Sequence, residues 1–244
     1  IYLNYMIKSI FKNFLIKISR IIYYLIPEEF SPENKNKLYK IYEKKKIYEC
    51  AEQFEKYLEK SALFTKRKGI QKYAITESLI NDENQIKFYL EFGVYKGETA
   101  NFFSNYVKKL YAFDSFEGLK ENWAGFADQK KGTFNLDKKI PKLKSNIEPI
   151  CGWVQDTLEI FLKKNNPTIN FVHFDVDTYE STKFILQKIK PFLNKNAILL
   201  FDQLYNYVGW KEGEYKALQE VFKEDEYTYV AFNLKGSQAV IKLN

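Results

Sequence analysis

The segment from Tyr89 to Gly118 constrains the fold of this chain most strongly. An apolar run ends at Glu91, two glycines follow at Gly93 and Gly97, and a second apolar run ends at Asp114. A short apolar run of this kind is typical of a buried parallel strand. Glycine lets the backbone turn sharply and approach a ligand where a side chain would collide. The pattern therefore predicts a strand, a glycine turn, a helix and a second strand.

These elements form half of a Rossmann-like unit, with strands over 86–92 and 110–114 and a helix over 98–109. Asp114 ends the second strand, where an acid can accept hydrogen bonds from a ribose diol. The spacing Glu-x-Gly-x-x-x-Gly lacks the Gly-x-Gly-x-x-Gly pattern that brings a pyrophosphate to a helix N-terminus. Glu91 would repel phosphate and favours a cationic ligand, such as the amino group of S-adenosylmethionine. A plain tight turn would explain the glycines alone, but acids at two consecutive strand ends favour a cofactor site.

From residue 86 onward, strand and helix patterns alternate, which predicts right-handed crossovers and a parallel sheet. The chain ends in two strands joined by a short turn, which are close enough to pair antiparallel. The predicted strands are 86–92, 110–114, 147–151, 169–175, 196–202, 227–232 and 238–243. We therefore predict an α/β, Rossmann-like fold of the class I methyltransferase type. Its sheet would be mainly parallel and seven-stranded, with an antiparallel last strand, and N-terminal helices would precede it.

Residues 1–70 are predicted to form a helical extension, and residues 71–244 the main domain. Apolar and basic residues at helical spacing predict an amphipathic helix over 5–25. Its lysines interrupt every apolar run, which excludes a transmembrane span or a signal-peptide core. Such a helix can lie on a membrane surface; packing on its own domain or across a homo-oligomer interface is the alternative that we favour. A break at 27–32 separates it from a charged helix over 34–61.

Length and composition fit one substantial core. The chain has 244 residues, of which 45% are hydrophobic, and its net charge of +7 comes from lysines interleaved with acids. This distribution is typical of solvated faces rather than a nucleic-acid surface. Cys50 and Cys151 are the only cysteines, so we expect no disulfide framework. A reducing cytoplasm is then the simplest location. Membrane association through residues 5–25 is the alternative. The chain begins with Ile1, and we expect it to be part of a longer translated product.

Five strings resemble those of the macrocin/mycinamicin-type sugar O-methyltransferases, in the same order. The resemblance extends from Tyr73 to Asn244. The strings are 91–99 (EFGVYKGET), 113–119 (FDSFEGL), 152–158 (GWVQDTL), 173–182 (HFDVDTYEST) and 201–202 (FD). The resemblance implies a class I S-adenosylmethionine-dependent fold, methyl transfer to a hydroxyl of a deoxysugar or related glycosyl group, and commonly a Mg²⁺ ion.

The resemblance also implies roles for individual residues in cofactor binding. Glu91 and the two glycines would line the methionine part of S-adenosylmethionine. Asp114 would bind the ribose hydroxyls, with Ser115 assisting. Asp156 matches the acid that lies near the adenine amino group, although an Asp before Thr-Leu-Glu would equally serve as a helix N-cap.

The chemical centre is predicted where the strand over 169–175 reaches the carboxyl edge of the sheet. Asp175 and Asp177 can both face this edge, and Asp202 ends the adjacent strand. Three carboxylates repel one another unless a cation or a shared proton compensates. Mg²⁺ is the natural candidate and could lower the pKa of an acceptor hydroxyl. By the resemblance, Gln203 stands where many relatives have a second acid. It can ligate through its carbonyl oxygen, but it removes a formal charge, so the metal could be weakly bound or absent. Alignment of the reactants would then supply much of the rate.

The general base is predicted to be Asp175 or Asp177. His173 is the only histidine, and a lone histidine in an apolar strand is more typical of a buried hydrogen-bonding residue than of a base. Aromatic residues within 120–140 and 204–214 suit the apolar faces of sugar rings, although they could equally pack these loops.

We expect an S-adenosylmethionine-dependent O-methyltransferase for a glycosyl or glycan substrate, in surface-polysaccharide or glycoside biosynthesis. A catechol- or phenol-type acceptor is the enzymatic alternative, and a cofactor-binding or membrane-associated scaffold without catalysis is the other.

Overall fold

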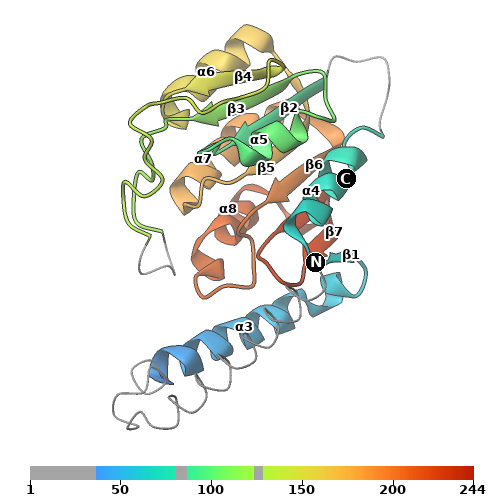
Figure 1. Ribbon diagram of the computed structural model, residues 1–244. Coiled ribbons are helices and arrows are strands. Elements are labelled where there is room, and N and C mark those ends of the chain that lie inside the picture. Colours follow the sequence, from blue (N-terminus) through green and yellow to red (C-terminus); the bar gives the residue numbers. More distant parts are fainter. Residues whose placement is uncertain (1–36, 81–86, 124–128) are drawn as a thin grey trace, which may run out of the picture. The chain divides into compact units, whose positions relative to one another are not determined.

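The computed structural model describes residues 37–80, 87–123 and 129–244 (Figure 1). The chain divides into two compact units, Ile1–Lys45 and Lys46–Asn244. Helix α3 (Lys37–Leu58) confirms the charged helix predicted over 34–61, whereas the predicted helix over 5–25 and the break at 27–32 lie outside the described residues. No helix in the described part of the chain is long and apolar enough to cross a membrane.

The second unit is built on an eight-stranded sheet in the order β1-β7-β8-β6-β5-β2-β3-β4. Strand β8 is antiparallel to β6 and β7, and all other neighbouring pairs are parallel. The strands are β1 (Ala62–Phe64), β2 (Lys87–Phe92), β3 (Leu110–Asp114), β4 (Ile147–Cys151), β5 (Thr168–Phe174), β6 (Leu193–Phe201), β7 (Tyr227–Asn233) and β8 (Ala239–Leu243). The predicted α/β class and antiparallel last strand are confirmed.

The sheet has one strand more than the seven predicted from the sequence, and the additional strand is β1. It has three residues, its central Leu63 is half exposed, and it pairs only with β7 at the edge of the sheet. Three residues are too few for a periodic pattern. Strand β1 lies ahead of the boundary expected at residue 70, and that boundary stays a prediction.

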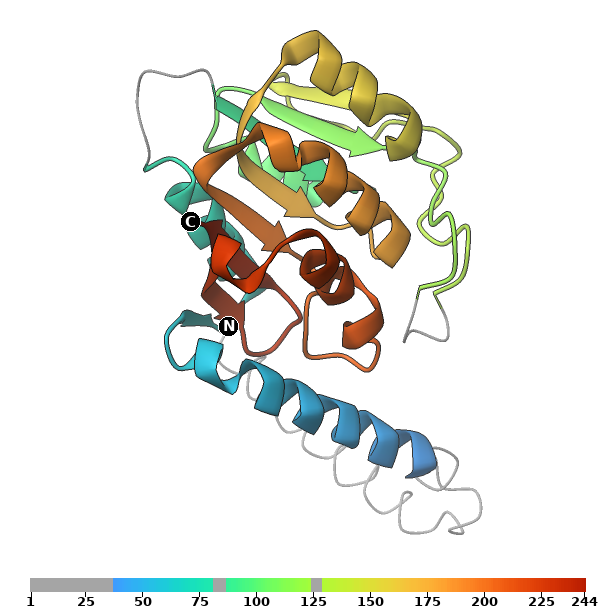
Figure 2. The same cartoon turned by 180° about the vertical axis from the view of Figure 1, so that it is seen from behind.

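Helices cover both faces of the sheet (Figures 1 and 2). Side chains of α6 (Val154–Asn165), α7 (Tyr179–Ile189) and α8 (Glu214–Val221) pack into one hydrophobic cluster, which also includes Phe54 of α3. Those of α4 (Arg67–Glu77) and α5 (Glu98–Phe103) pack into a second cluster. Three short 3₁₀ helices complete the described elements: η2 (Lys190–Phe192), η3 (Trp210–Glu212) and η4 (Glu224–Glu226).

Helix α5 is shorter than the predicted 98–109. Its end has a local cause, because Ser104 Oγ and Asn105 Nδ2 donate hydrogen bonds to the carbonyl oxygen of Asn101. Such side chains compete with the helical backbone for its carbonyls. Phe103 and Val107 nevertheless lie in the same buried cluster.

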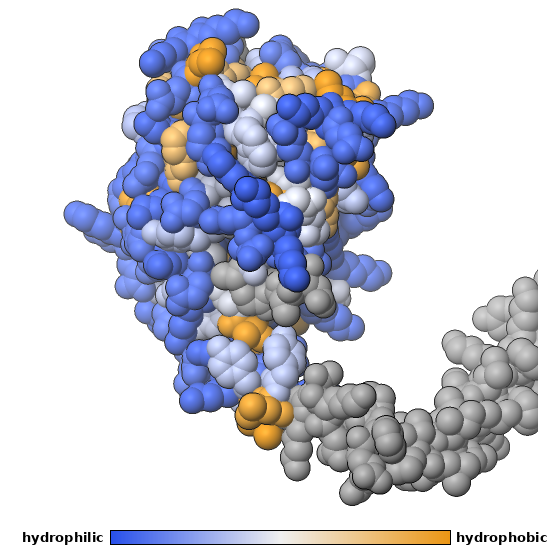
Figure 3. Space-filling view, turned by 90° about the vertical axis from the view of Figure 1, so that its left-hand side faces the viewer, coloured by the Kyte–Doolittle hydropathy of each residue, from blue (hydrophilic) through white to orange (hydrophobic). Residues whose placement is uncertain are grey.

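The face shown in Figure 3 is mostly hydrophilic, with apolar residues in small separate groups. This distribution agrees with lysines and acids that are spread over a solvated surface.

Candidate functional site

The turn after β2 requires glycine. Gly93 has φ +88°, and a Cβ atom there would lie 1.9 Å from the backbone oxygen of Asp175. Gly97 has φ +77° and precedes α5 as its N-cap. A Cβ on Gly97 would lie 2.6 Å from a Leu143 methyl group. The two glycines therefore let the turn lie directly against β5 and the loop that carries Leu143.

Asp114 holds this turn in place from the end of β3. One carboxylate oxygen accepts hydrogen bonds from the backbone amides of Val94 and Tyr95, at 2.7 and 2.8 Å. The other accepts from the amide of Phe116 at 2.7 Å. A carboxylate offers about four lone-pair positions, so Asp114 can still accept from a ligand. Beside it, Ser115 Oγ accepts from the amide of Glu117.

A cavity of about 280 Å³ lies along the carboxyl ends of β2, β3, β5 and β6. Its apolar wall includes Trp153 and Val154 at the start of α6, and Trp123 and Phe134 of the loop between β3 and β4. Phe126, of the same loop, lies outside the described residues. The predicted site residues that border the cavity are Gly93, Asp114, Ser115, Asp175, Asp177, Asp202 and Gln203. Glu91, Gly97, Asp156 and His173 do not border it.

Asp156 is exposed on the first turn of α6. The N-cap interpretation is wrong, because the helix starts at Val154 and its N-cap residue is Trp153. An acid in the first turn still interacts favourably with the helix dipole, which explains Asp156 without a ligand.

Glu91 and His173 form a fully buried pair behind the cavity. They are register partners in the parallel strands β2 and β5, and His173 Nδ1 lies 3.1 Å from Glu91 Oε1. Burial lowers the pKa of His173, but the carboxylates of Asp202 and Glu91 outweigh it and raise the pKa to about 10. A charged imidazole argues against a role for His173 as general base.

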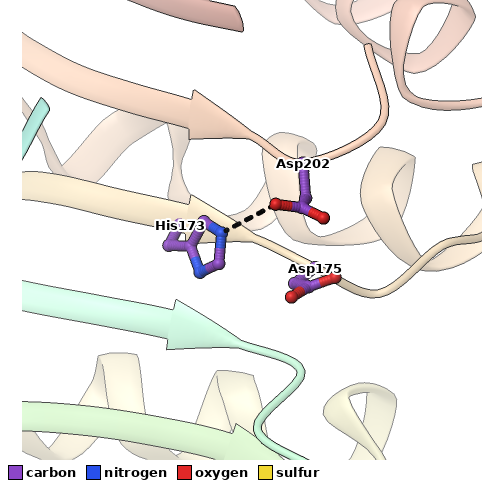
Figure 4. A group of neighbouring side chains, drawn as sticks. All are labelled: His173, Asp175 and Asp202. Carbon is purple, nitrogen blue, oxygen red and sulfur yellow. Dashed lines mark ion pairs between the residues drawn. The ribbon is translucent and has the colours of Figure 1, made fainter. Parts of the chain in front are cut away.

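The acids Asp175 and Asp202, at the ends of β5 and β6, lie beside His173 (Figure 4). His173 Nε2 is 3.8 Å from Asp202 Oδ1, an ion-pair distance. Burial and the neighbouring Asp202 raise the pKa of Asp175 to about 7, although His173 and Arg67 act in the opposite direction. For Asp202, burial acts to raise the pKa, and His173 and Arg67 outweigh it, so that the pKa is lowered.

Asp177 lies at the centre of a tight three-residue turn. Its φ is +63°, and the amide of Thr178 donates to the carbonyl of Val176 at 2.7 Å. This is a γ-turn with positive φ, a strained conformation that is often found at functional sites. The Asp177 side chain is buried, and burial followed by repulsion from Asp175 and Asp202 raises its pKa well above the usual range.

Sequence reasoning missed Arg67, which begins α4. Its Nη2 lies 3.0 Å from Asp175 Oδ2 and 2.9 Å from Asp202 Oδ1. The available signal was composition, since only Arg20 and Arg67 are arginines among 38 basic residues.

Glu214 and Gln238 were also missed. Glu214 Oε2 accepts a hydrogen bond from the backbone amide of Gln203 at 2.8 Å, and Gln238 Nε2 donates to Asp202 Oδ1 at 3.0 Å. Neither residue lies in a motif, so both were visible only in the folded chain.

A Mg²⁺ ion does not fit this arrangement of donors. His173, Asp175 and Asp202 offer ligand atoms that all lie within 4.8 Å of one another. However, Mg²⁺ needs free oxygen ligands, and Arg67 already binds both carboxylates. Gln203 presents Nε2, not oxygen, to Asp202 Oδ2 at 2.7 Å. The predicted ion stays a prediction, and none of the chemistry below depends on it.

The sequence and the fold were compared with known proteins. Residues 90–204 match the family described as "Methyltransferase domain". Comparison with curated proteins gives no match. Among solved structures, the calicheamicin methyltransferase CalS11 is 21% identical over 72% of this chain and 77% of its own, with a TM-score of 0.60. The O-methyltransferase NovP is 16% identical over 73% of this chain and 79% of its own, with a TM-score of 0.54. The chain therefore has a Rossmann-like methyltransferase fold, and its matched segment contains both the glycine turn and the acids at the ends of β5 and β6.

Proposed function

We propose that the protein is an S-adenosylmethionine-dependent O-methyltransferase that acts on a hydroxyl of a sugar or glycosyl group, in surface-polysaccharide or glycoside biosynthesis. The observation that carries the proposal is one cavity that joins the glycine turn and Asp114 to the acids Asp175, Asp177 and Asp202. The resemblance to sugar O-methyltransferases supports the glycosyl acceptor, as does CalS11, which is described as a TDP-rhamnose 3'-O-methyltransferase.

The cavity offers suitable groups for each part of this cofactor. Asp114 has about one lone-pair position left for a ribose hydroxyl, beside the turn at Gly93. Trp153 and Val154 supply an apolar wall suited to adenine. When bound, S-adenosylmethionine supplies a methyl group activated by a positively charged sulfur.

The transfer needs an acceptor oxygen in line with the methyl carbon and its sulfur. The oxygen forms a bond to that carbon while the carbon–sulfur bond breaks and its electron pair goes to the sulfur. The hydroxyl proton passes to a carboxylate. Asp175 is paired with Arg67, whereas Asp177 borders the cavity and has no ionic partner among residues 37–80, 87–123 and 129–244. We therefore assign Asp177 as the base and Asp175 as a positioning residue.

The test is incubation of the purified protein with labelled S-adenosylmethionine and a panel of nucleotide sugars, glycan fragments and catechols. Label in a sugar product supports the proposal, and label only in a catechol supports the phenol-type alternative. Cofactor binding in calorimetry without transfer to any of these acceptors would favour a non-catalytic scaffold. An Asp177→Asn variant that transfers methyl groups at the wild-type rate would contradict the assignment of the base.

The remaining expectations are proposals as well. They are a homo-oligomer, a cytoplasmic location and peripheral membrane contact through residues 5–25. Sedimentation of the protein alone, and of the protein with anionic vesicles, tests the first and the last.

A further inference from the structure

We propose that Arg67 provides the cation that this site needs, in place of a metal ion. In this inference the guanidinium group forms ion pairs with the carboxylates of Asp175 and Asp202 and positions the methyl acceptor. Methyl transfer should therefore continue when a chelator removes metal ions from the solution. The inference rests on the proposed function for its acceptor, but its metal-binding consequences can be measured without one.

The first argument is the geometry of the guanidinium group. A single nitrogen, Arg67 Nη2, lies within 3.0 Å of one oxygen from each of Asp175 and Asp202. The two acids end neighbouring parallel strands, so the sheet itself brings them together. Like charges at this separation need a compensating cation, and Arg67 is the positive group in contact with both.

The second argument is that protein donors already bind the acids. Asp202 Oδ1 accepts from Arg67 and Gln238, and Asp202 Oδ2 accepts from Gln203. Gln203 Nε2 also lies 3.5 Å from the second oxygen of Asp175. A metal site would present lone pairs to a central point, whereas this site presents N–H groups to the carboxylates. Gln203 therefore adds an N–H donor, rather than an oxygen ligand, to the contacts of both acids.

The third argument is that the fold fixes the position of Arg67. It is the first residue of α4, and that helix buries Ile70, Ala74 and Ile75 against the sheet. The Arg67 side chain is 48% exposed while that of Asp202 is 5% exposed, so the guanidinium approaches the acids from the open side. This is the side from which an acceptor would enter.

The fourth argument concerns the remaining donors of Arg67. Arginine carries five N–H groups in a rigid planar fork, and Nη2 supplies two of them. Arg67 borders both the cavity described above and a neighbouring hollow of about 390 Å³. Buried Gln71, whose Nε2 has no hydrogen-bond partner among the described residues, borders the same hollow. The unused donors of Arg67 and Gln71 together suit the oxygen-rich surface of a glycosyl acceptor.

The experiment has a metal-binding arm that needs no acceptor. Mn²⁺, as a spectroscopic probe for a magnesium site, is titrated into the full chain and followed by electron paramagnetic resonance. Wild type is expected to leave Mn²⁺ free at millimolar concentration, whereas Arg67→Ala, which uncovers two carboxylates, is expected to bind it. Tight binding of one Mn²⁺ by wild type would overturn the inference whether or not an acceptor is known.

The catalytic arm uses the sugar acceptor that the panel identifies. The wild-type initial rate is expected to be unchanged by EDTA, and Arg67→Ala is expected to lower kcat roughly 100-fold, as loss of a preorganised charged donor does. Guanidinium chloride at a non-denaturing concentration should restore part of the Arg67→Ala rate, whereas urea at the same concentration should not. Arg67→Lys should retain an intermediate rate, and Lys72→Ala, on the exposed side of the same helix, should behave as wild type.

The outcomes separate the two proposals. Loss of the wild-type rate in EDTA, with recovery on addition of Mg²⁺, would overturn the inference and leave the proposed function intact. Unchanged kcat in Arg67→Ala would do the same. Absence of transfer to every acceptor would overturn the proposed function, and the Mn²⁺ titration would still decide between a metal and Arg67.

Discussion

Replacement of Asp114 by alanine should destabilise the protein even without cofactor. The carboxylate accepts three backbone amides, and two of them, those of Val94 and Phe116, belong to residues that are 3% and 1% exposed. Tyr95 is 36% exposed, so water can satisfy the third amide. An unpaired buried amide costs ~1–3 kcal/mol, so two of them predict a loss of ~3 kcal/mol in the free energy of unfolding.

Urea unfolding of the cofactor-free protein measures this loss directly. Asp114→Asn keeps one oxygen acceptor and is expected to lose about half as much, ~1.5 kcal/mol. The control is Asp156→Ala, which removes an exposed acid from a helix N-terminus and should cost less than ~1 kcal/mol. If the free energy of unfolding of Asp114→Ala lies within ~1 kcal/mol of the wild-type value, the carboxylate does not hold the turn. Calorimetry then measures the separate loss of S-adenosylmethionine affinity, expected to be ~1.5–3 kcal/mol for a hydrogen bond to a charged group.

Three further predictions concern Phe54, the two cysteines and Asp177. Phe54→Ala should lower the free energy of unfolding by ~3–5 kcal/mol, because Phe54 is fully buried among aromatic rings. Tyr39→Ala, at an exposed position of the same helix, should change it little. Equal effects in urea or thermal unfolding would show that Phe54 does not anchor α3. Burial raises the pKa of the Cys50 thiol to about 11, so iodoacetamide at pH 8 should modify Cys151 first and Cys50 only after unfolding, as mass spectrometry would show. Asp177→Gly should relieve the strained φ and raise stability by ~1 kcal/mol while abolishing methyl transfer; a less stable variant would contradict the strain argument.

The sequence predicts most of the sheet, because its parallel strands are apolar runs whose ends carry glycine or acid. The start of β6 differs from the prediction. The strand begins at Leu193, three residues before the predicted start at residue 196, in a polar stretch without periodic apolar residues. Helix α4 has apolar residues at helical spacing but crosses the boundary expected at residue 70, so that its first turn lies in the segment assigned to the N-terminal extension. Arg67, at its start, reaches a carboxylate 108 positions away in the chain, and no local pattern predicts such a contact.

Glu91 shows how one residue's predicted role can differ from its place in the fold. Its position after an apolar run suggested an acid that faces a cationic ligand, but β2 and β5 place it opposite His173, with which it forms a buried ion pair. Register between distant strands decides this, and the sequence alone does not provide it.

The acids that border the cavity, rather than Glu91, are the basis on which we propose a cationic ligand. Four carboxylates, those of Asp114, Asp175, Asp177 and Asp202, line the cavity, against the cationic side chains of Arg67 and Lys120. A ligand with a positive sulfur and an amino group would relieve this excess of acids, whereas a bound pyrophosphate would add to it. The absence of a Gly-x-Gly-x-x-Gly turn and the surplus of acids therefore favour the same class of cofactor for independent physical reasons.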